Sequence, residues 1–279
     1  MIQTAWRAIT ALFIALAPPS IVVAKEQHRP SKQILETTLA TCYEVDPDFL
    51  PTINETVQNL TSKVRQAESA GKMITYLSVP LTARGGGYRP VNVEISEFLK
   101  LRVEAMFQGN VWVLAPGTVE SELPTVNGRI AQGGEYMYMW TQVLAGTDGM
   151  GRDFDMLFAA GPSEIGAFFG PPNDPVGALQ RYIDLRAKAD PDFRTKVAAS
   201  PDTKKSFIAY YSTKASVAFS SGSHDEWNIF VEINQRRRSH PEQFGLGNQI
   251  PVLFDGRSVS PAEMETKVSP GYEQPCPRE

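Results

Sequence analysis

The sequence predicts an α/β fold in which helices cover both faces of a parallel sheet. Three short apolar segments, at residues 73–79, 111–116 and 154–160, alternate with helix-sized segments that carry apolar residues at helical spacing. Strands that are apolar throughout are buried on both faces, and their alternation with helices is typical of βαβ units. The 279 residues are 42% hydrophobic and 21% charged, which is enough apolar material for a packed core.

Composition also excludes several classes of protein. The hydrophobic content is too high for a disordered chain, and the glycines lack the period of a collagen. The 27 basic and 31 acidic side chains give a net charge of −4, which argues against a binder of nucleic-acid polymers because such proteins carry a basic excess. One globular domain, or at most two, is therefore expected.

Residues 1–24 have the layout of a secretory signal peptide. Arg7 precedes a short apolar run at residues 8–17, and Val22 and Ala24 supply small residues for a cleavage site. The run is too short to cross about 30 Å of hydrocarbon, so cleavage is favoured over an N-terminal anchor. We therefore expect an exported protein, periplasmic or secreted, without membrane association after cleavage.

The two cysteines, Cys42 and Cys276, lie near opposite ends of the expected mature chain. An oxidising compartment permits a disulfide between them, and the alternative is two unpaired thiols. A disulfide that closes so long a loop would stabilise the folded protein by at most about 5 kcal/mol in the chain-entropy model. Neither cysteine has a second Cys or a His at ligand spacing, so we expect no metal site and no cofactor there.

The elements follow in order along the chain. Residues 52–70 carry Ile53, Val57, Leu60 and Val64 at helical spacing, and the strand at 73–79 ends before Pro80. Further helices are expected at 91–107 and 134–145 and from 162 onward, between the strands at 111–116 and 154–160. The prediction is a core at residues 52–170 within a single α/β domain at residues 25–257.

The chain beyond this core is predicted to be mostly helical. Helical spacing covers residues 175–189, 202–219 and 224–238, which makes residues 171–240 a helical extension. Residues 250–254 predict one more strand, at a sheet edge because Pro251 cannot donate to a ladder. The polar segment 258–279 is expected to be a surface tail.

The loops after the strands are the expected place for a site, because ligands of open parallel sheets bind beyond the carboxyl ends of the strands. The first loop offers a run of three glycines and two arginines that could hold a phosphate or carboxylate. Its candidate substrate-binding residues are Ser78, Arg84, Gly86, Tyr88 and Arg89. It matches neither a Walker loop nor a dinucleotide fingerprint, and the alternative is a mobile surface loop.

The junction after the third strand carries an acid. Glu164 is expected in the first turn of a helix, where the helix N-terminus stabilises a carboxylate. Ser163 precedes it and is a further candidate for substrate binding. The alternative is structural, with Ser163 as the cap and Glu164 as an acid of the first turn.

Three segments resemble the nucleoside 2-deoxyribosyltransferase-like family: YLSVP at 76–80, WVLAP at 112–116 and GPSEIGA at 161–167. The resemblance covers about residues 72–170 and implies a flavodoxin-like sheet. It also implies a nucleoside-like substrate, with Glu164 as the nucleophile that forms a covalent glycosyl-enzyme. Asp148, Asp153 or Asp155 would then protonate the leaving base or orient the sugar. Ser78 and Val79 stand where the family usually has Ala-Gly.

A second cluster lies at residues 220–228. His224 could line a pocket, and a serine hydrolase would use Ser221 or Ser223 with it, although the chain lacks a GxSxG elbow there. The favoured interpretation is structural, with Ser223 as the N-cap of a helix and Glu226 completing a capping box.

The leading hypothesis is therefore an exported enzyme that cleaves or transfers an N-glycosidic bond of a small nucleoside-like molecule, without a cofactor. The alternative is a non-catalytic binding protein of the cell envelope that holds a small ligand or a protein partner through the same loops. The sequence leaves the oligomeric state open.

Overall fold

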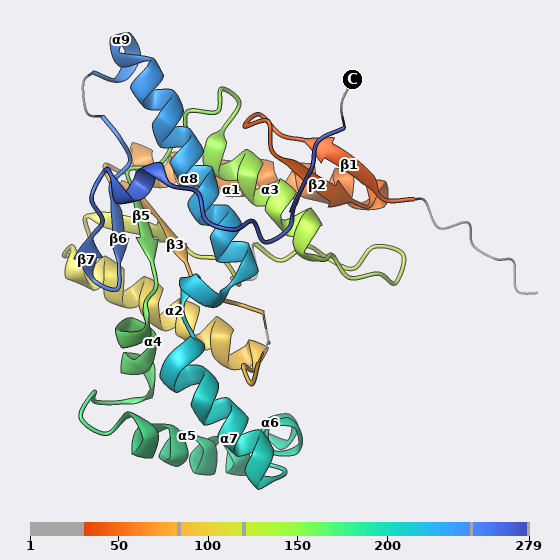
Figure 1. Ribbon diagram of the computed structural model, residues 1–279, viewed down its shortest axis with the longest axis vertical. Coiled ribbons are helices and arrows are strands. Elements are labelled where there is room, and N and C mark those ends of the chain that lie inside the picture. Colours follow the sequence, from red (N-terminus) through yellow and green to blue (C-terminus); the bar gives the residue numbers. More distant parts are fainter. Residues whose placement is uncertain (1–30, 83–84, 119–120, 246–247, 278–279) are drawn as a thin grey trace, which may run out of the picture. The chain divides into compact units, whose positions relative to one another are not determined.

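The computed structural model describes residues 31–82, 85–118, 121–245 and 248–277, which belong to one compact unit (Figure 1). A five-stranded sheet has the order β4-β3-β5-β6-β7, in which only β7 is antiparallel to its neighbour. This confirms the predicted parallel sheet. The bounds of the strands are β3 (Met73–Ser78), β4 (Val111–Leu114), β5 (Met156–Ala159), β6 (Val252–Phe254) and β7 (Arg257–Ser258).

The strand order is the flavodoxin-like one, because the chain places β4 on one side of β3 and then β5 and β6 on the other. The predicted edge position of the fourth strand is wrong. β7 pairs with β6 and takes that edge of the sheet. Pro251 directly precedes β6 and contributes only its carbonyl, which accepts from the Leu157 N–H, so its missing N–H costs no ladder bond.

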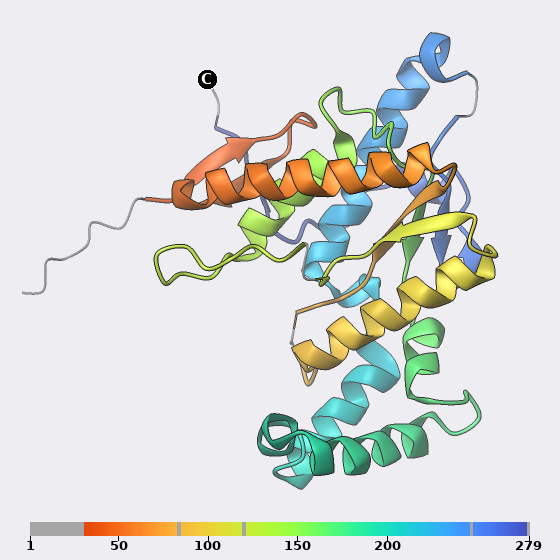
Figure 2. The same ribbon diagram turned by 180° about the vertical axis from the view of Figure 1, so that it is seen from behind.

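Side chains of β3 alternate between two cores, because successive residues of a strand point to opposite faces. Ile74 and Tyr76 pack into one core with helices α1, α3 and α8, whereas Leu77 packs into the other with α2 and α4. Figure 2 shows α1 and α2 on opposite sides of the strands. The bounds are α1 (Leu50–Ser69), α2 (Arg89–Met106), α3 (Gly133–Ala145), α4 (Pro162–Phe169) and α8 (Ser221–Ser239).

Proline marks the beginning of most of these helices. It lacks the N–H that would be unpaired in the first turn, and its φ suits that position. The helices with Pro in their first two positions are α1, α2, α4, α5 (Pro175–Ala189), α6 (Pro191–Lys196), α7 (Pro201–Ala209) and α9 (Pro241–Phe244). Part of the high proline content is therefore used to define helix starts.

The helical extension was predicted in outline, but α6 was not expected and one predicted helix is interrupted. The expected helix at 202–219 is α7 followed by a π-helical turn at Tyr210–Lys214 and a short 3-10 turn at Val217–Phe219. The wider turn directs aromatic rings into a cluster with Phe207, whose ring centroid lies 4.5 Å from that of Tyr211. Packing of these rings has overridden the regular helical period.

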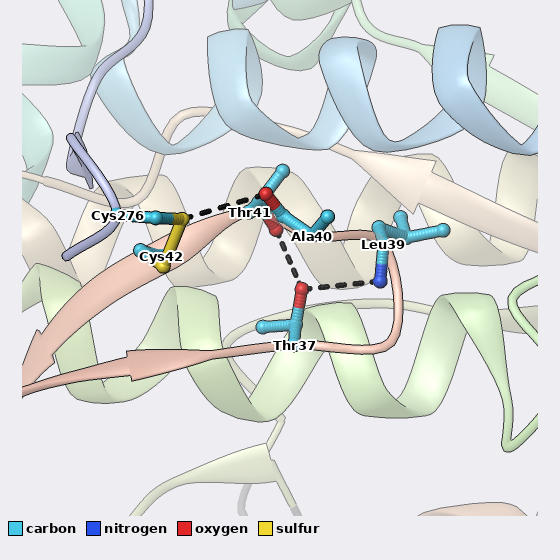
Figure 3. Close-up of a disulfide and its surroundings, with 6 residues drawn as sticks. All are labelled: Thr37, Leu39, Ala40, Thr41, Cys42 and Cys276. Atoms are coloured by element: carbon cyan, nitrogen blue, oxygen red, sulfur yellow. Dashed lines mark hydrogen bonds between the residues drawn. A yellow bond between two sulfur atoms is a disulfide. The ribbon is translucent and has the colours of Figure 1, made fainter. Parts of the chain in front are cut away.

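A second, three-stranded antiparallel sheet joins the two ends of the described chain. Its strands are β1 (Gln33–Glu36), β2 (Cys42–Val45) and β8 (Glu273–Gln274). The predicted disulfide between Cys42 and Cys276 is present beside it, and Figure 3 shows it at the start of β2, with the Cys276 sulfur against the Ala40 carbonyl. The bridge closes a loop of 234 residues.

Residues 266–276, which we term the C-terminal strap, run along α8 rather than forming a free tail. The Trp227 indole N–H donates to Thr266 O, and Asn228 exchanges two hydrogen bonds with the backbone of Val268. Asp225 accepts from the N–H groups of Gly271 and Tyr272. The strap is therefore a fixed part of the domain.

The predicted signal peptide at residues 1–24 lies outside the described residues. In the described part of the chain, no helix combines the length and the apolar character needed to cross a membrane.

Candidate active site

A cavity of about 450 Å³ opens at the carboxyl ends of β3 and β4. Its walls are the residues that follow these strands, the first turns of α3 and α8, and part of the C-terminal strap. The lining includes one residue from each of these segments: Val79, Pro116, Gly133, Ser223 and Tyr272. This position agrees with the rule that open parallel sheets bind ligands beyond their strand ends.

Glu226 lines this cavity with a carboxyl group that is almost completely buried, since the residue is 5% exposed. The Tyr76 hydroxyl donates to Oε1 at 2.6 Å, and the Ser78 hydroxyl donates to Oε2. Tyr76 and Ser78 are two positions apart in β3 and therefore point to the same face, which α8 covers. Each carboxyl oxygen thus has one fixed donor from a neighbouring element.

Burial raises the pKa of the Glu226 carboxyl to about 7, and the nearby charge of Asp225 acts in the same direction. The hydroxyls of Ser78 and Tyr76 oppose this effect because they stabilise the carboxylate. Burial and the Glu226 charge hold the pKa of Tyr76 well above its usual range, so this hydroxyl stays a donor. Near neutral pH, Glu226 can therefore act in its ionised form or carry a proton.

The rest of the cavity combines aromatic rings with two ion pairs, one of which joins Lys32 and Glu44 at 3.5 Å. Arg89 pairs with Glu122, which also accepts a hydrogen bond from the Tyr136 hydroxyl at 3.0 Å. The Trp140 ring packs on Tyr76 with their centroids 5.3 Å apart. Such a lining suits a small molecule that presents both a flat face and polar groups.

Glu164 occupies a different position. It lies in the first turn of α4, where its Oε2 accepts the Gly161 N–H at 3.3 Å, and it is not among the residues that line the Glu226 cavity. Asp255 completes the cap by accepting from the N–H and the hydroxyl of Ser163. Glu164 is therefore an acid of the first turn, as the structural alternative expected, but the expectation of Ser163 as the cap is wrong, because Gly161 is the N-cap and the Ser163 hydroxyl donates to Asp255.

The three aspartates expected to assist Glu164 lie before β5, whereas Glu164 follows that strand. Asp155 accepts the Ile74 N–H at 2.7 Å, Asp148 pairs with Arg152, and Asp153 lies 4.0 Å from Arg65. Asp155 directly precedes the strand, so the strand itself separates this carboxylate from Glu164 and from the cavity. The structure does not bring the expected pair of acids together.

The glycine-rich loop supplies only some of the substrate-binding residues that were expected from it. Arg84 lies outside the described residues. Gly86, at φ +111°, packs so closely on α7 that a Cβ would come within 2.2 Å of the Ser206 carbonyl. Tyr88 is turned toward the helical extension and donates to Asp192 at 2.7 Å. Ser78 and Arg89 are the members that reach the site, the first through its bond to Glu226.

His224 is held by backbone carbonyls and not by a serine. Its Nδ1 lies 3.0 Å from Ser269 O and its Nε2 lies 2.9 Å from Ala218 O. Neither ring nitrogen is therefore placed to accept a proton from a serine nucleophile. His224 lines a neighbouring cavity of about 590 Å³, which we term the second cavity.

The predicted capping box at Ser223 and Glu226 is wrong, because α8 begins earlier and Ser220 is its N-cap. Glu226 then falls in the second turn, on the face that is buried. The signal was present in the sequence, since Glu226, Phe230 and Ile233 have the spacing of one helical face and the last two are fully buried. An acid on an apolar face needs partners, and β3 supplies them.

In comparisons with known proteins, no family model, curated protein or solved structure matches this chain. Among the described residues, no group of three or more His, Cys, Asp and Glu side chains is placed to hold a metal ion.

Proposed function

We propose that the protein is an enzyme that cleaves or transfers the N-glycosidic bond of a nucleoside-like molecule, with Glu226 as the nucleophile. One observation carries the proposal: a buried carboxyl group faces a cavity and has a separate hydroxyl donor on each oxygen. The reaction class is the one that the sequence suggested, and the reacting residue moves from Glu164 to Glu226.

In this reaction the ionised Glu226 attacks the anomeric carbon and forms a glycosyl ester, while the bond to the base breaks and the base takes a proton from solvent. Water, or a second base in a transfer, then attacks the same carbon and releases the carboxylate. Tyr76 and Ser78 keep the carboxylate oriented and stabilise its charge when it is expelled. Tyr136 and Trp140 offer ring faces against which the base can stack.

The test uses the mature chain, residues 25–279, and a panel of purine and pyrimidine nucleosides, with released base measured by chromatography. Glu226→Gln should lower the rate by about a hundredfold or more, because the amide is not a nucleophile. Glu164→Gln is the matched control, since it removes an equally buried carboxyl outside the cavity. Its rate should stay within about twofold of the parent once folding is verified, as for changes outside the reacting groups.

Base release that persists in Glu226→Gln would disprove the assignment of the nucleophile. Nucleosides that bind to the parent without release of base would instead favour the alternative function, a binding protein of the cell envelope.

We also propose that the protein is exported. The Cys42–Cys276 disulfide supports this, because such bridges persist in oxidising compartments. Determination of the N-terminus of the protein isolated from its native host would test it, since a chain that still begins at Met1 would exclude removal of the leader.

A further inference from the structure

The hydroxyl of Ser223 stands out among the polar groups near Glu226. Ser223 is 3% exposed, and its Oγ makes no hydrogen bond with any described residue. It lines both the Glu226 cavity and the second cavity. A buried hydroxyl without a partner costs stability, and the position of Ser223 in the lining of the cavity allows a bound molecule to supply the missing partner.

Ser223 lies one helical turn before Glu226, which places the two side chains on neighbouring positions of α8. The hydroxyl is close enough to lower the pKa of the Glu226 carboxyl, yet the contact lacks the geometry of a hydrogen bond. Both carboxyl oxygens already accept from β3, through Tyr76 and Ser78. The Ser223 hydroxyl is therefore available to a molecule that approaches Glu226.

We propose that Ser223 hydrogen-bonds the sugar hydroxyl next to the anomeric carbon, so that the substrate is a ribonucleoside rather than a 2′-deoxyribonucleoside. This inference rests on the proposed function, because an anomeric carbon attacked by Glu226 brings the adjacent 2′-hydroxyl to the neighbouring side chain. A site built to bind a hydroxyl rejects the analogue that lacks it, since its own polar group then stays buried and unpaired.

The chain offers a matched control in Thr75 of β3. Its side chain is also fully buried, and its hydroxyl also has no partner among the described residues. Thr75 points to the face opposite Tyr76 and does not line either cavity. Thr75→Val therefore removes a comparable hydroxyl without touching the site.

The experiment measures the affinity for adenosine and for 2′-deoxyadenosine by calorimetry, both in carbocyclic form so that the protein cannot cleave them, together with the unfolding midpoint of each ligand-free protein. The parent should prefer adenosine by about tenfold or more. Ser223→Ala should bring this preference close to unity and leave the midpoint unchanged or higher, because an unpaired buried hydroxyl has been removed. Thr75→Val should have the same effect on the midpoint and keep the preference.

Three results would overturn the proposal: equal binding of the two nucleosides by the parent, no binding of either, or a Ser223→Ala protein that keeps the preference. A midpoint that falls by several degrees in Ser223→Ala would also contradict it, since the hydroxyl would then be structural. Because binding is measured apart from base release, a parent that prefers adenosine but releases no base disproves the proposed reaction and leaves the role of Ser223 supported.

Discussion

Two buried glutamates, Glu164 and Glu226, look alike by every local measure. They are 6% and 5% exposed, each lies in the first two turns of a helix, and burial raises the pKa of each to about 7. Their partners differ. Glu164 accepts the N–H of Gly161 at the start of its own helix, whereas Glu226 accepts two hydroxyls from β3 and lines a cavity.

The comparison shows that burial and a raised pKa identify a buried acid but do not identify a site. A capping carboxylate needs no other element, because the unpaired N–H groups of the first turn are its partners. A reactive carboxylate needs donors that fix it and an opening through which a substrate arrives. Only Glu226 of these two has both.

The largest expected effect concerns the strap, which fixes one wall of the Glu226 cavity through Tyr272. Replacing both Cys42 and Cys276 by Ser should lower the free energy of unfolding by up to about 5 kcal/mol, because the unfolded chain regains the entropy of a long loop. It should also weaken nucleoside binding, while the cap at Glu164 stays intact. Urea unfolding and calorimetry measure the two effects, and unchanged values for both would contradict a fixed strap.

The next effect concerns pH. Each of the two glutamates has a folded-state pKa of about 7 against an ordinary value of 4.5, so the stability that each contributes is largest below pH 4.5 and is lost as pH rises to about 7. Each accounts for a loss of about 3 kcal/mol over that window, since one pKa unit corresponds to about 1.4 kcal/mol.

Glu164→Gln and Glu226→Gln should each flatten this decline by a similar amount, and the double variant by about the sum, because the two sites share no hydrogen-bond partner. Urea unfolding at several pH values between 4.5 and 8 provides the measurement. Burial also raises the pKa of Asp225 to about 6, so a smaller decline should remain in the double variant. A decline as steep as that of the parent would show that groups other than the two glutamates cause it.

A smaller effect separates capping from catalysis. Asp255 accepts from the N–H and hydroxyl of Ser163 and from the Glu164 N–H, and it has a positive φ of 49°. Asp255→Gly keeps that backbone conformation without strain and removes the cap, so stability should fall by about 1–2 kcal/mol. The rate of base release should not change. A large loss of rate would link α4 to the site.

The smallest effect is expected at the aspartates before β5. Asp148 and Asp153 are partly exposed and lie beyond the opposite end of β5 from Glu164. Asp148→Asn together with Asp153→Asn should change stability by about 0.5 kcal/mol or less and leave the rate of base release unaltered. A reduction in kcat would place an acid of this group in the reaction after all.

Hydrophobic spacing predicted the elements with a strong local pattern. The Ile53, Leu60 and Val64 stripe marks α1, and the apolar runs at 73–79 and 111–116 mark β3 and β4. The short strands β1 and β2 were missed because neither has the continuous apolar run of β4 and β5, which are equally short, and neither shows a clear buried and exposed alternation. Without such a run, a pattern of that length does not rise above the variation of a loop.

The site was predicted only in part. Ser78 and Arg89 were identified because they follow the first strand, where ligands of such sheets bind. Glu226 was missed because Ser223 and Glu226 have the spacing of a capping box, a local pattern that the true helix start at Ser220 makes irrelevant.

By itself, the sequence determined the alternation of strands and helices, the pairing of Cys42 with Cys276, and the edge of the sheet where a ligand site was expected. The elements follow from the spacing of residues that are near neighbours in the chain, and the disulfide follows because each cysteine has one possible partner. The tertiary structure alone decided which glutamate faces a cavity, because the donors of Glu226 lie 150 and 148 residues away in β3. Contacts of that range arise from the packing of α8 on the sheet, and no local pattern encodes them.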